Sequence, residues 1–193
     1  MSEGSLPLRV SFSGASKGEW RVKQISALRG DALAAQNFVA VAEGRATPPQ
    51  GAAWTLSGYT SNLRYTTAQE RDGLAAIQAP LGRTNARNAA LIPIRKSAAW
   101  WNLAQDERRE IFEDSSRHIA IGLEYLPAVA RRLHHCRDVG EPFDFLTWFE
   151  FAPGAEAAFD AMVARLRATE EWRYVDREVD IRLVRSQDVE DGQ

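Results

Sequence analysis

The order of strand-like and helix-like segments is the feature that most limits the fold of this chain. Alternating apolar runs predict strands, and longer stretches with helical spacing predict helices. The predicted order is strand 8–13, strand 20–28, helix 31–43, strands within 54–66 and helix 67–78, then strand 89–95, helix 105–125, strand 128–137, strand 143–151, helix 154–168 and strand 178–184. This order is typical of an α+β protein made of two halves with antiparallel sheets.

The polar, turn-rich segment Pro80 to Arg87 is the predicted boundary between the halves. We therefore expect an N-terminal half at 1–85, a C-terminal half at 86–185 and a flexible polar tail at 186–193. The sequence contains no measurable repeat between the halves, so their duplication is a hypothesis.

Composition excludes several classes of protein. The 193 residues carry a formal net charge of −2, which gives no general field for binding nucleic acid or an anionic membrane. The single cysteine, Cys136, excludes an intrachain disulfide. No apolar run is long enough to span a bilayer, and the first residues do not resemble a secretory signal. We expect a cytoplasmic protein without a nucleic-acid or membrane partner.

The three histidines have different prospects as ligands. Ser115 and Gly122 lie three residues before and four residues after His118, so small side chains would flank it on one helix face. That space suits a flat ligand such as a porphyrin, and it equally suits a closely packed second helix. His134 and His135 would point to opposite faces of a strand, which disfavours a metal cluster with Cys136.

Arg131 is the most informative charged residue. In a strand over 128–137 its side chain would lie between Val129 and Leu133, where a guanidinium needs either an anionic partner or a route to water. A hairpin would place Thr147 and Phe149 on one face of the opposing strand. Pro127 allows the chain to turn back after the helix, so His118 and Arg131 can share a ligand.

Several segments in the same order resemble the chlorite dismutase family of haem enzymes, especially its short, dimeric branch. The resemblance is good over 54–185. It rests on Ser61 to Thr66 (SNLRYT), Ala90 to Ser97 (ALIPIRKS), Trp100 to Leu103 (WWNL), Glu107 to Phe112 (ERREIF), His118 to Ala120 (HIA), Tyr125 to Arg131 (YLPAVAR), Gly140 to Glu150 (GEPFDFLTWFE) and Leu166 to Trp172 (LRATEEW).

The resemblance implies a fold, a cofactor and a set of site residues. Two ferredoxin-like halves would form a β-barrel, and the protein would be a homodimer containing haem b. His118 would be the proximal iron ligand and Arg131 the distal arginine. The remaining assignments are Glu171 and Lys96 behind the histidine, Leu133, Thr147 and Phe149 as distal walls, and Asn62, Ile92 and Trp100 at the haem edge or propionates.

The activity implied by the resemblance is the conversion of chlorite to chloride and dioxygen, with detoxification as its benefit. Coproheme decarboxylases of the same superfamily are the nearest alternative, but many of them have glutamine where this chain has Arg131. The sequence also leaves open a peroxidase and a non-enzymatic haem carrier or sensor.

Overall fold

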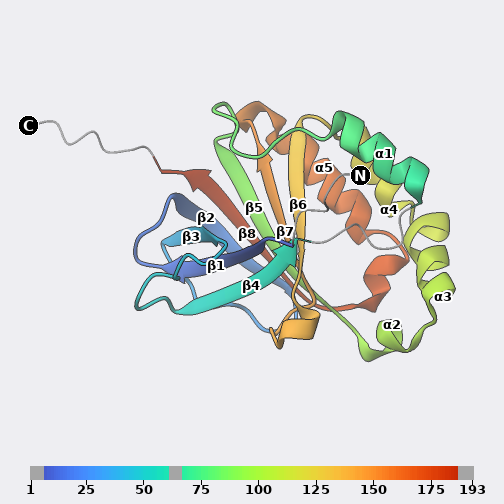
Figure 1. Ribbon diagram of the computed structural model, residues 1–193, viewed down its shortest axis with the longest axis horizontal. Helices are drawn as coiled ribbons and strands as arrows, with labels where there is room; N and C mark the ends of the chain where they lie inside the picture. Colours follow the sequence, from blue (N-terminus) through green and yellow to red (C-terminus); the bar gives the residue numbers. More distant parts are fainter. Residues whose placement is uncertain (1–6, 61–66, 187–193) are drawn as a thin grey trace, which may run out of the picture.

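The computed structural model describes residues 7–60 and 67–186, which form an eight-stranded closed barrel covered on one side by helices (Figure 1). All strand pairs are antiparallel. The strands are β1 Arg9–Ala15, β2 Trp20–Arg29, β3 Phe38–Glu43, β4 Trp54–Thr60, β5 Asn88–Lys96, β6 Val129–His135, β7 Phe145–Phe151 and β8 Val175–Arg185.

The two halves of the barrel have the same strand order. Around the barrel, β4-β1-β3-β2 is followed by β8-β5-β7-β6, so the strands of each half are arranged as fourth, first, third and second. Pairing of β2 with β8 and of β4 with β6 joins the halves and closes the barrel. The predicted α+β fold with two ferredoxin-like halves is confirmed. The domain limits at 85 and 185 stay predictions.

The helices are concentrated on the C-terminal half (Figure 1). They are α1 Ala68–Ile77, α2 Ala98–Asn102, α3 Gln105–Arg109, α4 His118–Glu124 and α5 Glu156–Arg167, with the π-helical segment η1 Glu110–Ser115 and the 3-10 turns η2 Arg137–Val139, η3 Pro153–Ala155 and η4 Glu171–Tyr174. In the N-terminal half, the connection from β3 to β4 contains no helix. None of the described helices is long and apolar enough to cross a membrane.

Two apolar clusters divide the strand residues by face. One fills the barrel and takes side chains from both halves, including Phe12, Leu91, Trp148 and Ile181. The other lies between the outer face of the C-terminal sheet and the helices, where side chains such as those of Ile92 and Phe149 meet α4 and α5. The alternation along each strand therefore decides which residues face the helices.

The predicted helix at 31–43 is wrong. Residues 38–43 form β3, which pairs with β1 and β2, and residues 31–37 are irregular. The alanine-rich start favours a helix, but Phe38, Val39 and Val41 are strand-forming residues, and their pairing and burial outweigh local helix propensity.

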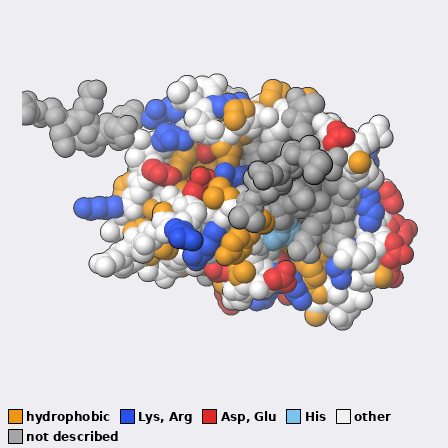
Figure 2. All heavy atoms as spheres, viewed as in Figure 1, with side chains coloured by type: hydrophobic (Ala, Val, Ile, Leu, Met, Phe, Trp, Pro, Cys, Tyr) orange, Lys and Arg blue, Asp and Glu red, His pale blue; other side chains and the backbone are white. Residues whose placement is uncertain are grey.

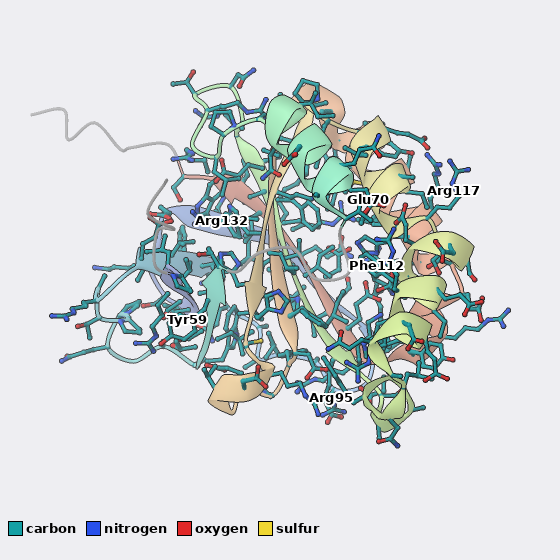
Figure 3. All side chains as sticks on the ribbon, turned by 45° about the vertical axis from the view of Figure 1, so that its right-hand side comes forward. Tyr59, Glu70, Arg95, Phe112, Arg117 and Arg132 are labelled. Atoms are coloured by element: carbon teal, nitrogen blue, oxygen red, sulfur yellow. The ribbon has the colours of Figure 1, made fainter. Side chains whose placement is uncertain are left out.

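The predicted continuous helix at 105–125 is also wrong. The chain forms α3, then η1, and resumes as α4 at His118 after Arg117, which has a left-handed φ of 53°. Ser115 is therefore not at helical spacing from His118, whereas Gly122 is on the same helix. Figure 3 shows Phe112 on the sheet side of this segment and Arg117 on its outer side.

Pro93 in β5 predicts either an edge strand or an irregularity, and the structure shows the irregularity. β5 pairs with β7 on one side and with β8 on the other, but its ladder to β8 omits residues 92 and 93. Proline has no N–H to donate, so the interruption falls where the ladder would need one.

Candidate haem site

A buried chain of charged and polar groups links three of the predicted site residues. His118 Nδ1 lies 2.6 Å from Glu171 Oε2, and Lys96 Nζ donates to Glu171 Oε1 at 2.7 Å. His118 begins α4, Lys96 ends β5, and Glu171 begins η4, with three residues between it and the end of α5. Segments far apart in the sequence therefore meet at one carboxylate, as the resemblance implied.

Glu171 is held as a carboxylate. Its burial acts to raise the pKa, but electrostatic attraction to the His118 side chain and the Lys96 ammonium, with a hydrogen bond to each, outweighs burial and lowers the pKa of Glu171 to about 2. Its side chain is 4% exposed, as is that of Lys96. A buried carboxylate opposite Nδ1 fixes that nitrogen as the donor and leaves Nε2 as the lone-pair nitrogen.

Aromatic rings fix the plane of the His118 imidazole. Phe112 stacks on it with ring centroids 4.3 Å apart and planes 22° apart, and Trp172 lies nearly parallel at 6.4 Å. The His118 side chain is 27% exposed, and Nε2 has no hydrogen-bond partner within the described part of the chain. The imidazole is thus held with one nitrogen available to a ligand.

Arg131 lies on the outer face of the barrel, under the helices. β6 pairs with β7 so that Arg131 is opposite Phe149 and Leu133 is opposite Thr147. β7 in turn pairs Thr147 with Ile92 of β5. Leu133, Thr147 and Phe149 therefore share the face of Arg131, as the strand alternation predicted.

The guanidinium of Arg131 lies against the helix that carries His118. A Cβ atom added to Gly122 would come within 2.7 Å of Arg131 Cζ and closer still to Nη1, so a larger residue here would force the guanidinium to move. Gly122 is four residues after His118, which places it on the same face about 6 Å along the helix. The structure thus brings His118 and Arg131 together.

Arg131 is half-buried, and no carboxylate among the described residues pairs with its side chain. Burial lowers the pKa of Arg131 to about 10, so the guanidinium remains charged at neutral pH. A cation that lacks an anionic partner in an apolar setting favours an anionic ligand.

The predicted haem-edge residues have different positions. Ile92 is buried on the face of Arg131. Trp100 is also buried, and its ring lies 4.6 Å from Lys96 Nζ, so its observed contact is with the residues behind His118. Asn62 falls outside the described residues, and its role stays a prediction.

Sequence reasoning missed several residues that support this site. Ser116 Oγ accepts the backbone N–H of Glu171 at 2.9 Å, and Glu113 binds the first turn of α4. Phe112 and Trp172 flank the imidazole. The prediction of one long helix concealed the roles of Glu113 and Ser116 because it placed both residues inside a regular helix.

His134 and His135 do point to opposite faces, as expected. His134 is buried in the barrel, with Nδ1 2.9 Å from the carbonyl oxygen of Leu146, and burial lowers its pKa to about 4. His135 packs against Phe145 on the outer face. The described residues contain no group of three or more His, Cys, Asp or Glu side chains able to hold a bare metal ion.

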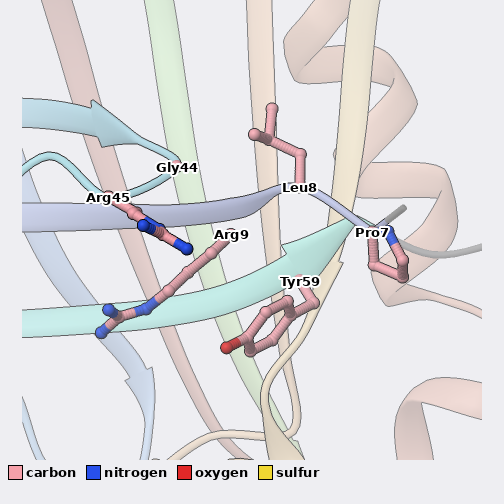
Figure 4. Close-up of a pocket in the computed structure, with 6 residues that line it drawn as sticks. All are labelled: Pro7, Leu8, Arg9, Gly44, Arg45 and Tyr59. Carbon is pink, nitrogen blue, oxygen red and sulfur yellow. The ribbon is translucent and has the colours of Figure 1, made fainter. Parts of the chain in front are cut away.

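A separate surface hollow of about 620 Å³ involves none of the predicted site residues (Figure 4). It lies beside β1 and β4 and is lined by Pro7, Leu8, Arg9, Gly44, Arg45 and Tyr59. On the face of the molecule drawn in Figure 2, apolar side chains are dispersed among charged ones. Because its lining includes none of the predicted site residues, the hollow is distinct from the site built around His118 and Arg131.

The donor set fits a haem bound by one imidazole. A proximal haem ligand needs a free ring nitrogen and an acceptor for the other N–H, and His118 with Glu171 supplies both. The apolar sheet face of Ile92 and Phe149 suits the side of a porphyrin, and Gly122 keeps the helix surface flat. A free imidazole nitrogen backed by a buried carboxylate, with a guanidinium against the same helix, is the kind of donor set that histidine-ligated haem proteins use.

Comparisons with known proteins identify the family. The family model described as chlorite dismutase matches residues 36–186, and the chain belongs to this family. The chain is similar to the structure of a dimeric chlorite dismutase from Nitrobacter winogradskyi, with 53% identity and a TM-score of 0.86 over 92% of this chain and 99% of that one.

Two more distant relatives add to the comparison. A curated chlorite dismutase from Ideonella dechloratans is 36% identical over 64 residues, which cover 33% of this chain and only 21% of that protein. A chlorite dismutase variant from Candidatus Nitrospira defluvii, solved with cyanide, has a TM-score of 0.66 over 93% of this chain and 91% of that one. At 17% identity this structure supports the fold alone.

Substituting Glu171 with glutamine is expected to raise the reduction potential of bound haem. A neutral amide withdraws less of the Nδ1 proton, so the imidazole donates less to ferric iron. We expect the ratio of the protein's affinities for ferric and ferrous haem to fall about tenfold or more. Each tenfold fall raises the reduction potential by about 59 mV. Redox titration of the Soret band measures this, and an unchanged potential would remove Glu171 from this role.

The Glu171→Gln variant also leaves Lys96 buried without its partner, which costs about 3–5 kcal/mol. The double variant Lys96→Met/Glu171→Gln removes both charges and serves as the matched control for stability.

The pKa of Glu171 predicts an acid-dependent loss of stability. Because its folded-state value of about 2 lies below the ordinary 4.5, the carboxylate stabilises the fold above pH 4.5. This contribution is lost as the pH falls from 4.5 towards 2. Urea unfolding of haem-free protein at a series of pH values gives the free energy of unfolding. Between pH 4.5 and 2 this free energy should fall more steeply with decreasing pH in the wild type than in Glu171→Gln, by up to about 1.4 kcal/mol per pH unit. Parallel curves would contradict the lowered pKa.

Proposed function

We propose that this protein is a haem b-dependent chlorite dismutase that converts chlorite to chloride and dioxygen. One observation carries the proposal. The Lys96–Glu171–His118 chain ends on helix α4, and the Arg131 guanidinium lies against Gly122 of the same helix. Membership of the family and the 53% identity to the Nitrobacter protein support it.

The residues behind His118 favour the oxidised cofactor. His118 would bind iron through Nε2, and Glu171 would accept the Nδ1 proton. This hydrogen bond makes the imidazole a stronger donor and stabilises ferric iron. Bound haem supplies the redox chemistry that rearranges chlorite.

Arg131 would hold the substrate. Its guanidinium stays cationic at neutral pH and offers several N–H donors in a fixed plane, which suits the oxygens of chlorite. The overall reaction, ClO₂⁻ to Cl⁻ and O₂, consumes no proton and needs no general base. The role left to the protein is to keep the chlorine- and oxygen-containing groups together until both products have formed.

The family alternative is coproheme decarboxylation. Haem-loaded protein should release oxygen from chlorite in an oxygen-electrode trace, alongside an absorption spectrum of the same preparation. Decarboxylation of coproheme without oxygen release would overturn the proposal, as would peroxidase turnover with no oxygen from chlorite.

We also propose the assembly, compartment and remaining site residues of this enzyme. The chain forms a homodimer, which the structure of the dimeric Nitrobacter relative supports. It acts in the cytoplasm, where removal of chlorite is its benefit. Leu133, Thr147 and Phe149 form the distal wall, with Asn62, Ile92 and Trp100 at the haem edge.

A further inference from the structure

The helix that carries His118 begins without an ordinary cap. Arg117 is the residue before α4, and its side chain makes no capping hydrogen bond to that helix. Serine, threonine, aspartate and asparagine normally accept the first free N–H groups of a helix. The first turn of α4, where His118 lies, therefore needs an acceptor from elsewhere.

Glu113 supplies that acceptor from the preceding π-helical segment. Its Oε2 accepts from the backbone N–H of Ile119 at 2.7 Å, and its Oε1 accepts from that of Ala120 at 3.3 Å. Its backbone carbonyl also accepts from the N–H of Arg117 at 2.9 Å. Glu113 thus accepts hydrogen bonds from Arg117, where the helix is interrupted, and from the first turn of α4 that follows.

The direction of the first turn decides where the imidazole points. His118 is the first residue of α4, so a rotation of that turn moves Nδ1 relative to Glu171 Oε2, 2.6 Å away. The Glu171 end of this hydrogen bond is tied to the same segment, because Ser116 Oγ, two residues before His118, accepts the backbone N–H of Glu171. On the histidine side, Glu113 restrains the backbone of the first turn, while the rings of Phe112 and Trp172 set the plane of the imidazole.

We propose that Glu113 is a positioning residue for the haem ligand: by capping α4 it aligns His118 with Glu171 and so sets the donor strength of the imidazole. The inference rests on the proposed function, because it assigns Glu113 to the reaction through the iron ligand. A carboxylate that merely stabilises a helix end would affect the stability of the folded protein and leave the reduction potential of the cofactor unchanged.

The test compares Glu113→Ala, Glu113→Gln and Glu110→Ala in haem-loaded protein. Glutamine removes the charge but keeps one acceptor oxygen, so it separates positioning from charge. Glu110 is an exposed carboxylate in the same segment, with no capping bond to α4 among the described residues, and serves as the control. The readouts are the reduction potential and the iron–histidine stretching frequency from resonance Raman spectra.

We expect Glu113→Ala to lower the ferric-to-ferrous affinity ratio about tenfold, a rise of about 59 mV, and to lower the iron–histidine frequency. Glu113→Gln should show a smaller but measurable change, about a third of that ratio change, and Glu110→Ala none. Equal shifts in the alanine and glutamine variants, or an unchanged potential in Glu113→Ala, would overturn the role of Glu113.

The two proposals fail in different ways. If the wild-type protein releases oxygen from chlorite and Glu113→Ala keeps its potential, only the positioning role is wrong. If the wild-type protein binds no haem, the proposed function is wrong and the positioning role is overturned with it. Should Glu113→Ala not fold, the comparison of Glu113→Gln with wild type decides: a shift in the potential and the iron–histidine frequency supports positioning, and unchanged values overturn it.

Discussion

Replacing His118 with alanine is expected to abolish stable haem binding. His118 is the only histidine on α4, and the Glu171 carboxylate lies at Nδ1 and not at the nitrogen that would bind iron. We expect haem affinity to fall at least ~100-fold, with loss of the Soret band after gel filtration. Absorption spectra of protein reconstituted with one equivalent of haem measure this directly.

His135 provides the matched control for this experiment. It lies on the same barrel face as Arg131 but packs against Phe145, so His135→Ala should keep its Soret band. Added imidazole should restore haem binding to His118→Gly by filling the space of the lost side chain. A full Soret band in His118→Ala, or its loss in His135→Ala alone, would show that the ligand is misassigned.

Replacing Arg131 with alanine is expected to remove most chlorite turnover while haem stays bound. The guanidinium lies near His118 but donates to no described carboxylate, so the folded protein loses no ion pair with it. The loss of an oriented cationic donor at the reacting anion should lower kcat/KM about 10²–10³-fold. Oxygen release at several chlorite concentrations gives this value, and the Soret band verifies the haem content.

Arg132 is the control because it is the next residue on the same strand and its side chain lies on the opposite face of β6, where it pairs with the exposed Glu43. Arg132→Ala should keep turnover per haem near the wild-type value. Arg131→Lys keeps the charge but not the planar fork of donors, so we expect an intermediate loss. If Arg131→Ala evolved oxygen at the wild-type rate, the protein would not need a distal cation.

The sequence predicted the part of the site that depends on strand alternation. Once 128–137 and 143–151 are paired as a hairpin, Arg131, Leu133, Thr147 and Phe149 must share a face, and the observed register confirms this. The two-residue period is a local property of extended backbone, so it needs no knowledge of the rest of the fold.

The sequence could not predict elements that depend on partners far along the chain. β3 forms because Phe38 to Glu43 pairs with β1 and β2, although the alanines before it favour a helix. The closure of the barrel through β2 and β8 joins residues more than a hundred positions apart. Such pairings leave no periodicity in the sequence.

The meeting of Lys96, Glu171 and His118 was available only from the family resemblance. None of their spacings is a local motif, and without the fold both Lys96 and Glu171 would be taken for surface charges. The contribution of Glu113 was hidden further, because it depends on a helix that breaks at Arg117. Helical spacing predicts the face of a regular helix, and it fails where the helix is interrupted.

The most direct test of the central claim is the isotopic composition of the oxygen released from chlorite labelled with ¹⁸O in ordinary water. If Arg131 keeps the chlorine- and oxygen-containing groups together beside a His118-bound haem, both oxygen atoms should come from one chlorite ion. We predict dioxygen in which both atoms are ¹⁸O, with one chloride for each dioxygen. Release of no oxygen, or of oxygen containing an atom from water, would contradict this claim.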